Sequence, residues 1–100
     1  MKMQIVDRHD ILDDAGRELA ERRLRFALTR FEPQVARVLL VLRDVNGPRG
    51  GIDKACRLDV HLRDGNPLSI SDADANALAA VSRVADRAGR AVGRRLQRAD

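Results

Sequence analysis

Residues 78–98, LAAVSRVADRAGRAVGRRLQR, carry the clearest periodic pattern in the chain. Apolar side chains recur every three or four residues, and arginines recur at the same intervals on nearly the opposite face. This spacing is typical of an amphipathic α-helix that buries one stripe and exposes the other. The predicted buried stripe consists of Leu78, Val81, Ala85, Ala88, Val92 and Leu96.

Two glycines, Gly89 and Gly93, lie beside this stripe, although each costs about 1 kcal/mol of helix propensity relative to alanine. We expect close approach to a second helix to compensate. The sequence predicts that helix from Asp13 or Asp14, which can cap it, to about Phe31, with Pro33 ending it. Its apolar positions at helical spacing are Ala20, Leu24, Ala27, Leu28 and Phe31.

Strands are predicted on either side of this first helix. Residues 4–6 are short and apolar, which indicates an initial strand. Residues 35–45 are rich in valine and leucine and predict a longer strand. The glycine- and proline-containing segment 46–51 then predicts a loop.

The next segment predicts a hairpin. Residues 56–62 alternate between apolar and polar side chains, as in a strand with one buried face. Asp64-Gly65 is a turn signal, and residues 68–70 form a brief final strand. Ser71 or Asp72 is then expected to cap the last helix.

The fold class is therefore α+β, with the order β-α-β-β-β-α. We expect two layers, in which both helices cover one face of a four-stranded, mostly antiparallel sheet, as in double-stranded RNA-binding domains. A chain of 100 residues that is 44% hydrophobic suits one modest core, so residues 1–100 are expected to form a single domain. No apolar run suits a bilayer or a signal peptide, and Cys56 is the only cysteine. We therefore expect a cytoplasmic protein without disulfides.

The net charge of +4 comes mainly from arginine, because Lys2 and Lys54 are the only lysines. A basic surface favours a polyanionic partner. Arginine and alanine richness is also typical of GC-rich genomes, and a solvated basic face can serve solubility alone. The placement of the arginines has to decide between these interpretations.

The arginines of the last helix fall on one face, with Asp86 as the only acid among them. Like charges four residues apart repel by a few tenths of a kcal/mol, which favours an anionic partner. The basic second half of the first helix can extend this face, and Lys54, Arg49 and Arg57 are further candidates. No tryptophan or tyrosine is present and both phenylalanines lie on the first helix, so base stacking is not expected. The predicted RNA-binding residues are Arg22, Arg23, Arg83, Arg87, Arg90, Arg94, Arg95 and Arg98.

Catalytic chemistry is not expected. His9 and His61 have no evident nucleophile beside them, and Asp72 and Asp74 suit helix capping better than metal binding. The glycine-rich loop lacks the spacing of a nucleotide cradle. We expect no enzyme activity, metal, cofactor or small-molecule substrate.

Three features resemble the ribosome hibernation-promoting factor and ribosome-associated inhibitor A family. Residues 12–24, LDDAGRELAERRL, are similar to that family's first-helix pattern of Ile-Thr-Glu-Ala-Leu-Arg-Glu-aromatic followed by a basic residue. Residues 79–81 and 86–88 are similar to its second-helix Tyr-Ala-Ala-Ile-Asp and Asp-Lys-Leu. The order of elements is also that of the family. Gly16, Leu78 and Ser82 depart from its usual leucine, tyrosine and aspartate, which indicates a divergent member of the short form.

The resemblance implies binding to ribosomal RNA of the small subunit, in the channel used by messenger and transfer RNA, with inhibition of translation and preservation of idle ribosomes. It implies roles for Arg22, Arg23, Arg87, Arg90 and Arg94, whereas Arg83, Arg95 and Arg98 follow from the helical spacing alone. We expect a monomer. Two alternatives stay open: a module for structured RNA outside the ribosome, and a protein-interaction module that uses a sheet edge or the exposed strand face.

Overall fold

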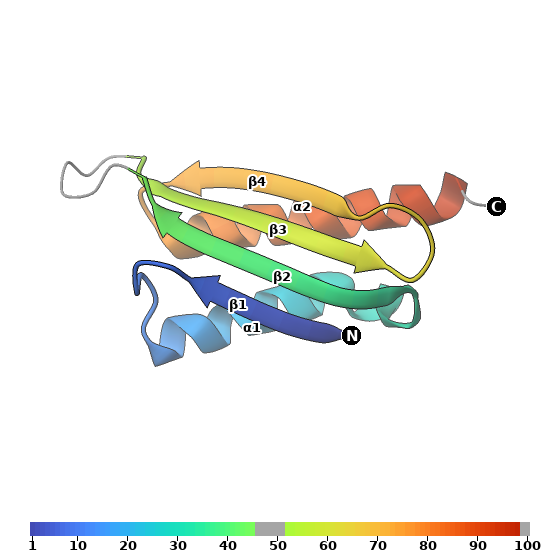
Figure 1. Ribbon diagram of the computed structural model, residues 1–100, viewed down its shortest axis with the longest axis horizontal. Coiled ribbons are helices and arrows are strands. Elements are labelled where there is room, and N and C mark those ends of the chain that lie inside the picture. The colour runs from blue at the N-terminus through green and yellow to red at the C-terminus, as the bar shows by residue number, and fades with distance from the viewer. Residues whose placement is uncertain (46–51, 99–100) are drawn as a thin grey trace.

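The computed structural model describes residues 1–45 and 52–98, and shows the expected order of elements (Figure 1). The predicted loop at 46–51 lies outside the described residues. The elements are β1 (Lys2–Asp7), α1 (Asp14–Leu28), the 3-10 helix η1 (Thr29–Gln34), β2 (Val35–Asp44), β3 (Lys54–Leu62), β4 (Leu68–Asp74) and α2 (Ala77–Arg98).

The four strands form one sheet in the order β1-β2-β3-β4. β1 and β2 are parallel neighbours, and the crossover helix α1 connects them along the chain. The β2–β3 and β3–β4 pairs are antiparallel. Figure 1 shows both helices side by side behind the sheet, so that its other face is uncovered. The predicted two-layer α+β fold is confirmed.

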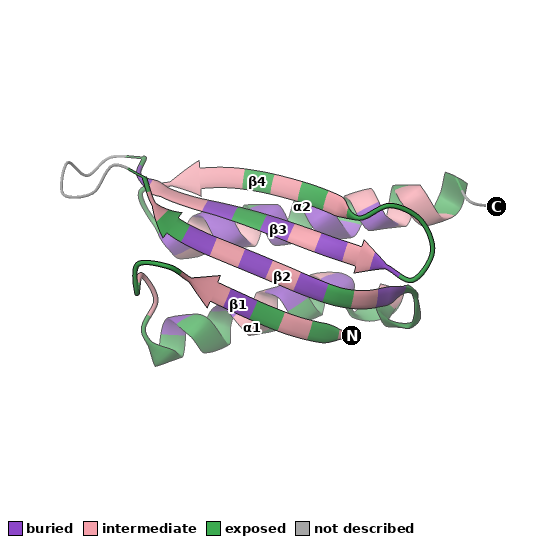
Figure 2. Ribbon diagram, viewed as in Figure 1, coloured by how far each residue is buried: buried purple, intermediate pink, exposed green. Residues whose placement is uncertain are grey.

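The core lies between the sheet and the two helices. Cys56, Leu58, Val60 and Leu62 of β3 are buried, which confirms the predicted alternation, and Figure 2 shows the same alternation along β2. Because neighbouring residues of a strand point to opposite faces, the residues that alternate with these buried ones lie on the uncovered face of the sheet. The core side chains of α2 are Ala80, Val81, Val84, Ala85, Ala88 and Val92, and Leu78 and Leu96 are half-buried at its ends.

The first helix begins as predicted and ends earlier. Asp13 caps it, because its Oδ1 accepts a hydrogen bond from the Gly16 backbone N–H at 2.7 Å. The α-helix ends at Leu28 rather than near Phe31, and Pro33 lies inside the 3-10 helix that follows. In an α-helix the Pro33 ring would clash with the carbonyl four residues earlier. The chain therefore tightens into 3-10 geometry before it reaches the proline.

The prediction for the start of the last helix was wrong. β4 continues to Asp74, and α2 begins at Ala77 after Asn76, whose Oδ1 accepts a hydrogen bond from the Ala79 N–H at 3.2 Å. Asp72 therefore lies on the strand and does not cap the helix. Pairing with β3 extends this far, because Lys54 is the register partner of Asp74.

The glycines of α2 lie where the two helices meet, as expected. A Cβ atom on Gly89 would lie 2.9 Å from the Ala27 carbonyl oxygen, and one on Gly93 would lie 3.3 Å from the Phe31 ring. Gly89 lies against Ala27, and Gly93, four residues later, lies against Phe31, which is four residues after Ala27. The two segments therefore run in the same direction at this contact. Within 1–45 and 52–98, no helix is long and apolar enough to cross a membrane.

Candidate nucleic-acid interface

The arginines of α2 point away from the sheet. Arg83, Arg87, Arg90, Arg94 and Arg98 are all exposed, on the side opposite the buried stripe. Arg90, Arg94 and Arg98 form no ion pair or hydrogen bond with any other residue that the structure describes. These three guanidinium groups are therefore available for a polyanion, since none of them is ion-paired with a described carboxylate.

Arg83 is instead held by β4. Its Nε donates to Asp72 Oδ2 at 2.9 Å, and its Nη2 donates to Asp74 Oδ2 at 2.9 Å and to the Ala73 carbonyl at 3.1 Å. The hydrogen bonds to Asp72 and then Asp74 raise the pKa of Arg83. Charge neutralisation by two carboxylates removes the main reason for assigning Arg83 to RNA. From the sequence, Asp72 and Asp74 were expected at the start of a helix, where they would not contact Arg83.

Arg87 and Arg95 also reach the β4 side of the molecule. The Nη1 of Arg87 donates to the Ser71 carbonyl at 2.9 Å and lies 3.6 Å from Asp72. The Nη1 of Arg95 donates to the Asn66 carbonyl at 2.8 Å, and its side chain is only half-exposed. Arg87 therefore holds α2 against the edge strand β4, and Arg95 holds it against the β3–β4 connection. The bond from Arg87 to the Ser71 carbonyl satisfies an edge acceptor that an added strand would otherwise use.

We expect Arg83→Gln to destabilise the fold, lowering the midpoint of thermal unfolding near neutral pH by a few degrees, while leaving RNA affinity largely unchanged. The hydrogen bond from Arg83 holds the pKa of Asp72 below its ordinary value. The hydrogen bond from the Asn76 backbone N–H, and then the one from Arg83, lower the pKa of Asp74. A lowered folded-state pKa stabilises the protein above the unfolded-state pKa, and this contribution is lost as the pH falls through the folded-state value.

The difference between wild type and Arg83→Gln should therefore shrink between about pH 7 and about pH 3. Thermal unfolding followed by circular dichroism at both pH values measures it. Arg98→Gln is the matched control, because Arg98 is exposed and makes no contact of this kind with the described residues. Equal unfolding midpoints for the two variants would contradict the assignment of Arg83 to the fold.

Three further arginines come from α1 and from η1, which follows it: Arg22, Arg23 and Arg30. Arg22 is exposed, and Arg23 is half-buried with its Nη2 lying 3.6 Å from Asp86 of α2. The Nε of Arg23 is buried and has no hydrogen-bond partner among the described residues. Arg30 of η1 is exposed, and its guanidinium lies 4.8 Å from the centre of the Phe31 ring. Arg30 was not among the predicted site residues, although its spacing of seven from Arg23 would place it on the same helical face.

A groove runs between the two helices, and we call it the inter-helix groove. Arg30 and Phe31 line one side of it, Arg90 and Arg94 line the other, and Gly89 forms part of its floor. The expected merging of arginines from the two helices is therefore seen in the structure. It occurs at the carboxyl-terminal half of α2, because Arg83 and Arg87 turn toward β4.

An aromatic residue also borders this surface, which the sequence interpretation did not anticipate. Phe26 of α1 is 81% exposed and lines the same groove as Arg30 and Arg90. The two phenylalanines were assigned to the first helix and treated as separate from the arginine face. Packing of the helices brings both of them to its edge.

The other candidate cations lie elsewhere. Lys54 is paired with Asp44 at 3.3 Å and with Asp53 at 3.0 Å. Arg57 alternates with the core residues of β3, so it lies on the uncovered sheet face, 3.3 Å from Asp59. Neither residue extends the helical face, and Arg49 lies outside the described residues.

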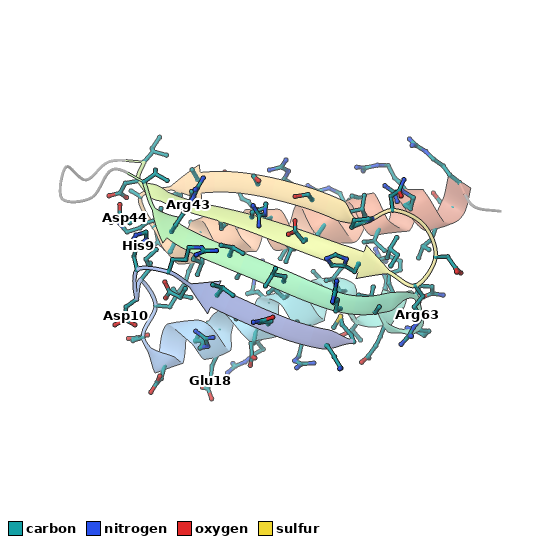
Figure 3. The ribbon with its side chains drawn as sticks, viewed as in Figure 1. His9, Asp10, Glu18, Arg43, Asp44 and Arg63 are labelled. Carbon is teal, nitrogen blue, oxygen red and sulfur yellow. The ribbon has the colours of Figure 1, made fainter. Side chains whose placement is uncertain are left out.

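His9 and Cys56, whose side chains could be reactive, take part in the fold. His9 Nδ1 accepts the Asp44 backbone N–H at 3.0 Å, which joins the β1–α1 connection to the end of β2 (Figure 3). Burial raises the pKa of the Cys56 thiol to about 11, so this thiol is largely protonated near neutral pH. In the part of the chain that the structure describes, no cluster of three or more histidine, cysteine, aspartate or glutamate residues is arranged to hold a metal ion.

Comparisons with known proteins give matches in structure only. No protein-family model matches the chain, and no curated protein matches its sequence. The N-terminal domain of Protein Y from Thermus thermophilus matches with a TM-score of 0.75 and 24% sequence identity, over 94% of this chain and 98% of that one. A ribosomal subunit interface protein from Coxiella burnetii matches with a TM-score of 0.78 and 15% identity, over 97% of this chain and 99% of that one. The resemblance drawn from the sequence is thus confirmed at the level of the fold.

Proposed function

We propose that this chain is a divergent member of the ribosome hibernation-promoting factor family and that it binds ribosomal RNA of the small subunit through its helical face. The observation that carries the proposal is the set of exposed arginines around the inter-helix groove. Arg30, Arg90 and Arg94 come from two elements, face one groove and form no ion pair within the described residues. The structural match to a ribosomal subunit interface protein supports the choice of partner.

Phosphate oxygens are the RNA groups that suit this surface best. Arginine donates parallel hydrogen bonds from a planar fork, which matches the geometry of a phosphate. Contacts of this kind fix the position of a protein on folded RNA and carry little sequence information. The protein is therefore proposed to recognise the shape of folded ribosomal RNA.

The biological consequence follows from the family resemblance. We propose that the bound protein lies near the channel for messenger and transfer RNA, inhibits translation and stabilises idle ribosomes in the cytoplasm. This role requires binding and no catalysis. A monomer is sufficient for it, because the proposed groove is complete within one chain.

Addition of a strand from another protein at the β4 edge is a weaker alternative. Arg83 and Arg87 donate to the Ala73 and Ser71 carbonyls of the edge strand β4. These bonds occupy backbone acceptors on which strand addition depends. RNA binding by the helical face has no such competition from the described residues.

Co-sedimentation of the purified protein with small ribosomal subunits tests the proposal. We expect saturable binding near one copy per subunit at roughly 50 mM salt, with an affinity about 100-fold weaker at roughly 200 mM if about four phosphates are contacted. An RNA duplex of arbitrary sequence serves as the competitor. Duplex competition that equals that of free small subunits would favour a general RNA-binding module, and absence of binding at both salt concentrations would refute the proposal.

A further inference from the structure

Phe26 is the most exposed of the large hydrophobic side chains that the structure describes. It is 81% exposed, compared with 70% for Ile52 and 44% for Leu19. Single exposed apolar residues are common on protein surfaces and need no explanation by themselves. Phe26 differs from such residues because it borders a groove that is lined by Arg30 of η1 and Arg90 of α2.

The groove beside Phe26 is shaped by close contact of the helices. Its floor includes Ala27 and Gly89, where the missing Cβ atom of Gly89 would lie 2.9 Å from the Ala27 carbonyl oxygen. Arg30 and Arg90 stand on its two sides. The part of the inter-helix groove beside Phe26 has a volume of about 390 Å³, which is near the lower end of the range for ligand-binding clefts. A flat, small group is therefore a better occupant than a folded peptide segment.

The charges around the groove favour an anionic occupant. Arg30 and Arg90 form no ion pair with any described residue, whereas the one acid of the groove, Asp86, lies 3.6 Å from Arg23. The nearest carboxylate is therefore partly neutralised. A protein partner that buried Phe26 would also have to bury these unpaired cations, which is costly unless it supplied matching acids. A nucleotide supplies an aromatic plane and a phosphate in one unit.

We propose that Phe26 is a stacking platform for one unpaired base of the bound RNA, with Arg30 and Arg90 holding the phosphates that flank this base. The inference rests on the proposed function and adds to it a preference for RNA with an extruded or looped-out nucleotide. Bases that are splayed out of a helix are the parts of RNA that proteins read most readily. Stacking on an aromatic side chain tolerates any base, because every base has a π face.

The test compares Phe26→Leu, which stays apolar but loses the aromatic ring, with Phe26→Tyr, which keeps it. Leu19→Ala is the matched control, because Leu19 is a partly exposed apolar residue of the same helix that does not line the groove. The probes are small ribosomal subunits and two RNA hairpins, one fully paired and one with a single bulged 2-aminopurine. Quenching of 2-aminopurine fluorescence reports stacking.

We expect Phe26→Leu to weaken binding to small subunits by about 5- to 150-fold and to abolish the preference for the bulged hairpin and its quenching. Phe26→Tyr and Leu19→Ala should behave as wild type. Because Phe26 is exposed, neither substitution at this position should shift the unfolding midpoint, which is measured in parallel for all three variants.

Two outcomes would overturn the stacking inference while leaving the proposed function intact. In the first, Phe26→Leu binds subunits like wild type although charge reversal at Arg90 and Arg94 removes binding. In the second, Phe26→Leu changes the sedimentation coefficient of the free protein without changing RNA affinity, which would assign Phe26 to self-association. Failure of the wild-type protein to bind small subunits would instead refute the proposed function itself.

Discussion

Replacing Arg90 and Arg94 together by glutamate is expected to weaken binding to small ribosomal subunits by about 100-fold or more. Hydrogen bonds to charged groups contribute about 1.5–3 kcal/mol each, and glutamate adds repulsion from the phosphates. Both arginines are exposed and make no ion pair with other described residues, so their replacement breaks no interaction recorded in the fold. Co-sedimentation at roughly 50 mM salt measures the affinity, and thermal unfolding verifies that the variant is folded.

A control of equal charge is available on the opposite side of the molecule. Arg37 and Arg43 of β2 are exposed and alternate with the core residues, so they lie on the uncovered sheet face, and Figure 3 shows Arg43 near one end of this strand. Replacing both by glutamate changes the net charge by the same amount. We expect less than about a tenfold loss of affinity, because only long-range attraction is reduced. Equal losses in the two double variants would show that net charge, and not the helical face, governs binding.

Replacing Gly89 by valine is expected to lower the free energy of unfolding by about 1–3 kcal/mol. The added Cβ would lie 2.9 Å from the backbone carbonyl oxygen of Ala27, so the two helices would have to separate. Overpacking of a closely packed contact typically costs this amount. The gain in helix propensity over glycine offsets only a part of it. Urea unfolding followed by circular dichroism measures the change.

Gly93→Val is the matched control for this prediction. A Cβ on Gly93 would meet the Phe31 ring at 3.3 Å, and a half-buried side chain can move aside more easily than backbone. We therefore expect a clearly smaller loss than at Gly89. Equal losses at the two positions would mean that the cost arises from valine in the helix and not from the contact with Ala27.

The sequence predicted those features that depend on neighbouring residues. The stripe through Val81, Ala85 and Val92 is buried because helical periodicity is a local property, and the alternation in β3 is right for the same reason. Gly89 was understood as a point of close approach, because an unfavourable residue beside a buried stripe requires a packing reason. What the sequence did not specify was which part of the other helix Gly89 would meet.

The features that the sequence did not predict are decided by tertiary structure. Arg83 was predicted to bind RNA from its helical spacing alone, and the aspartates that hold it in the fold, Asp72 and Asp74, were expected at a helix start. Their place on β4 depends on how far pairing with β3 continues, which no nearby residue specifies. Phe26 and Arg30 were not placed at the site, because the offset of α1 against α2 is fixed by the contact between Ala27 and Gly89. Sequence spacing shows which residues share a helical face and leaves open which faces adjoin.

Site-specific photo-cross-linking to small ribosomal subunits tests the central proposal most directly, because it identifies the face that touches RNA. A photoreactive amino acid is placed at Gln97, which is exposed and lines the inter-helix groove, or at Ser69, which is exposed on the uncovered face of β4. We expect cross-links to small-subunit RNA from position 97 and few or none from position 69. Cross-links from position 69 alone would place RNA on the sheet and contradict the assignment of the helical face.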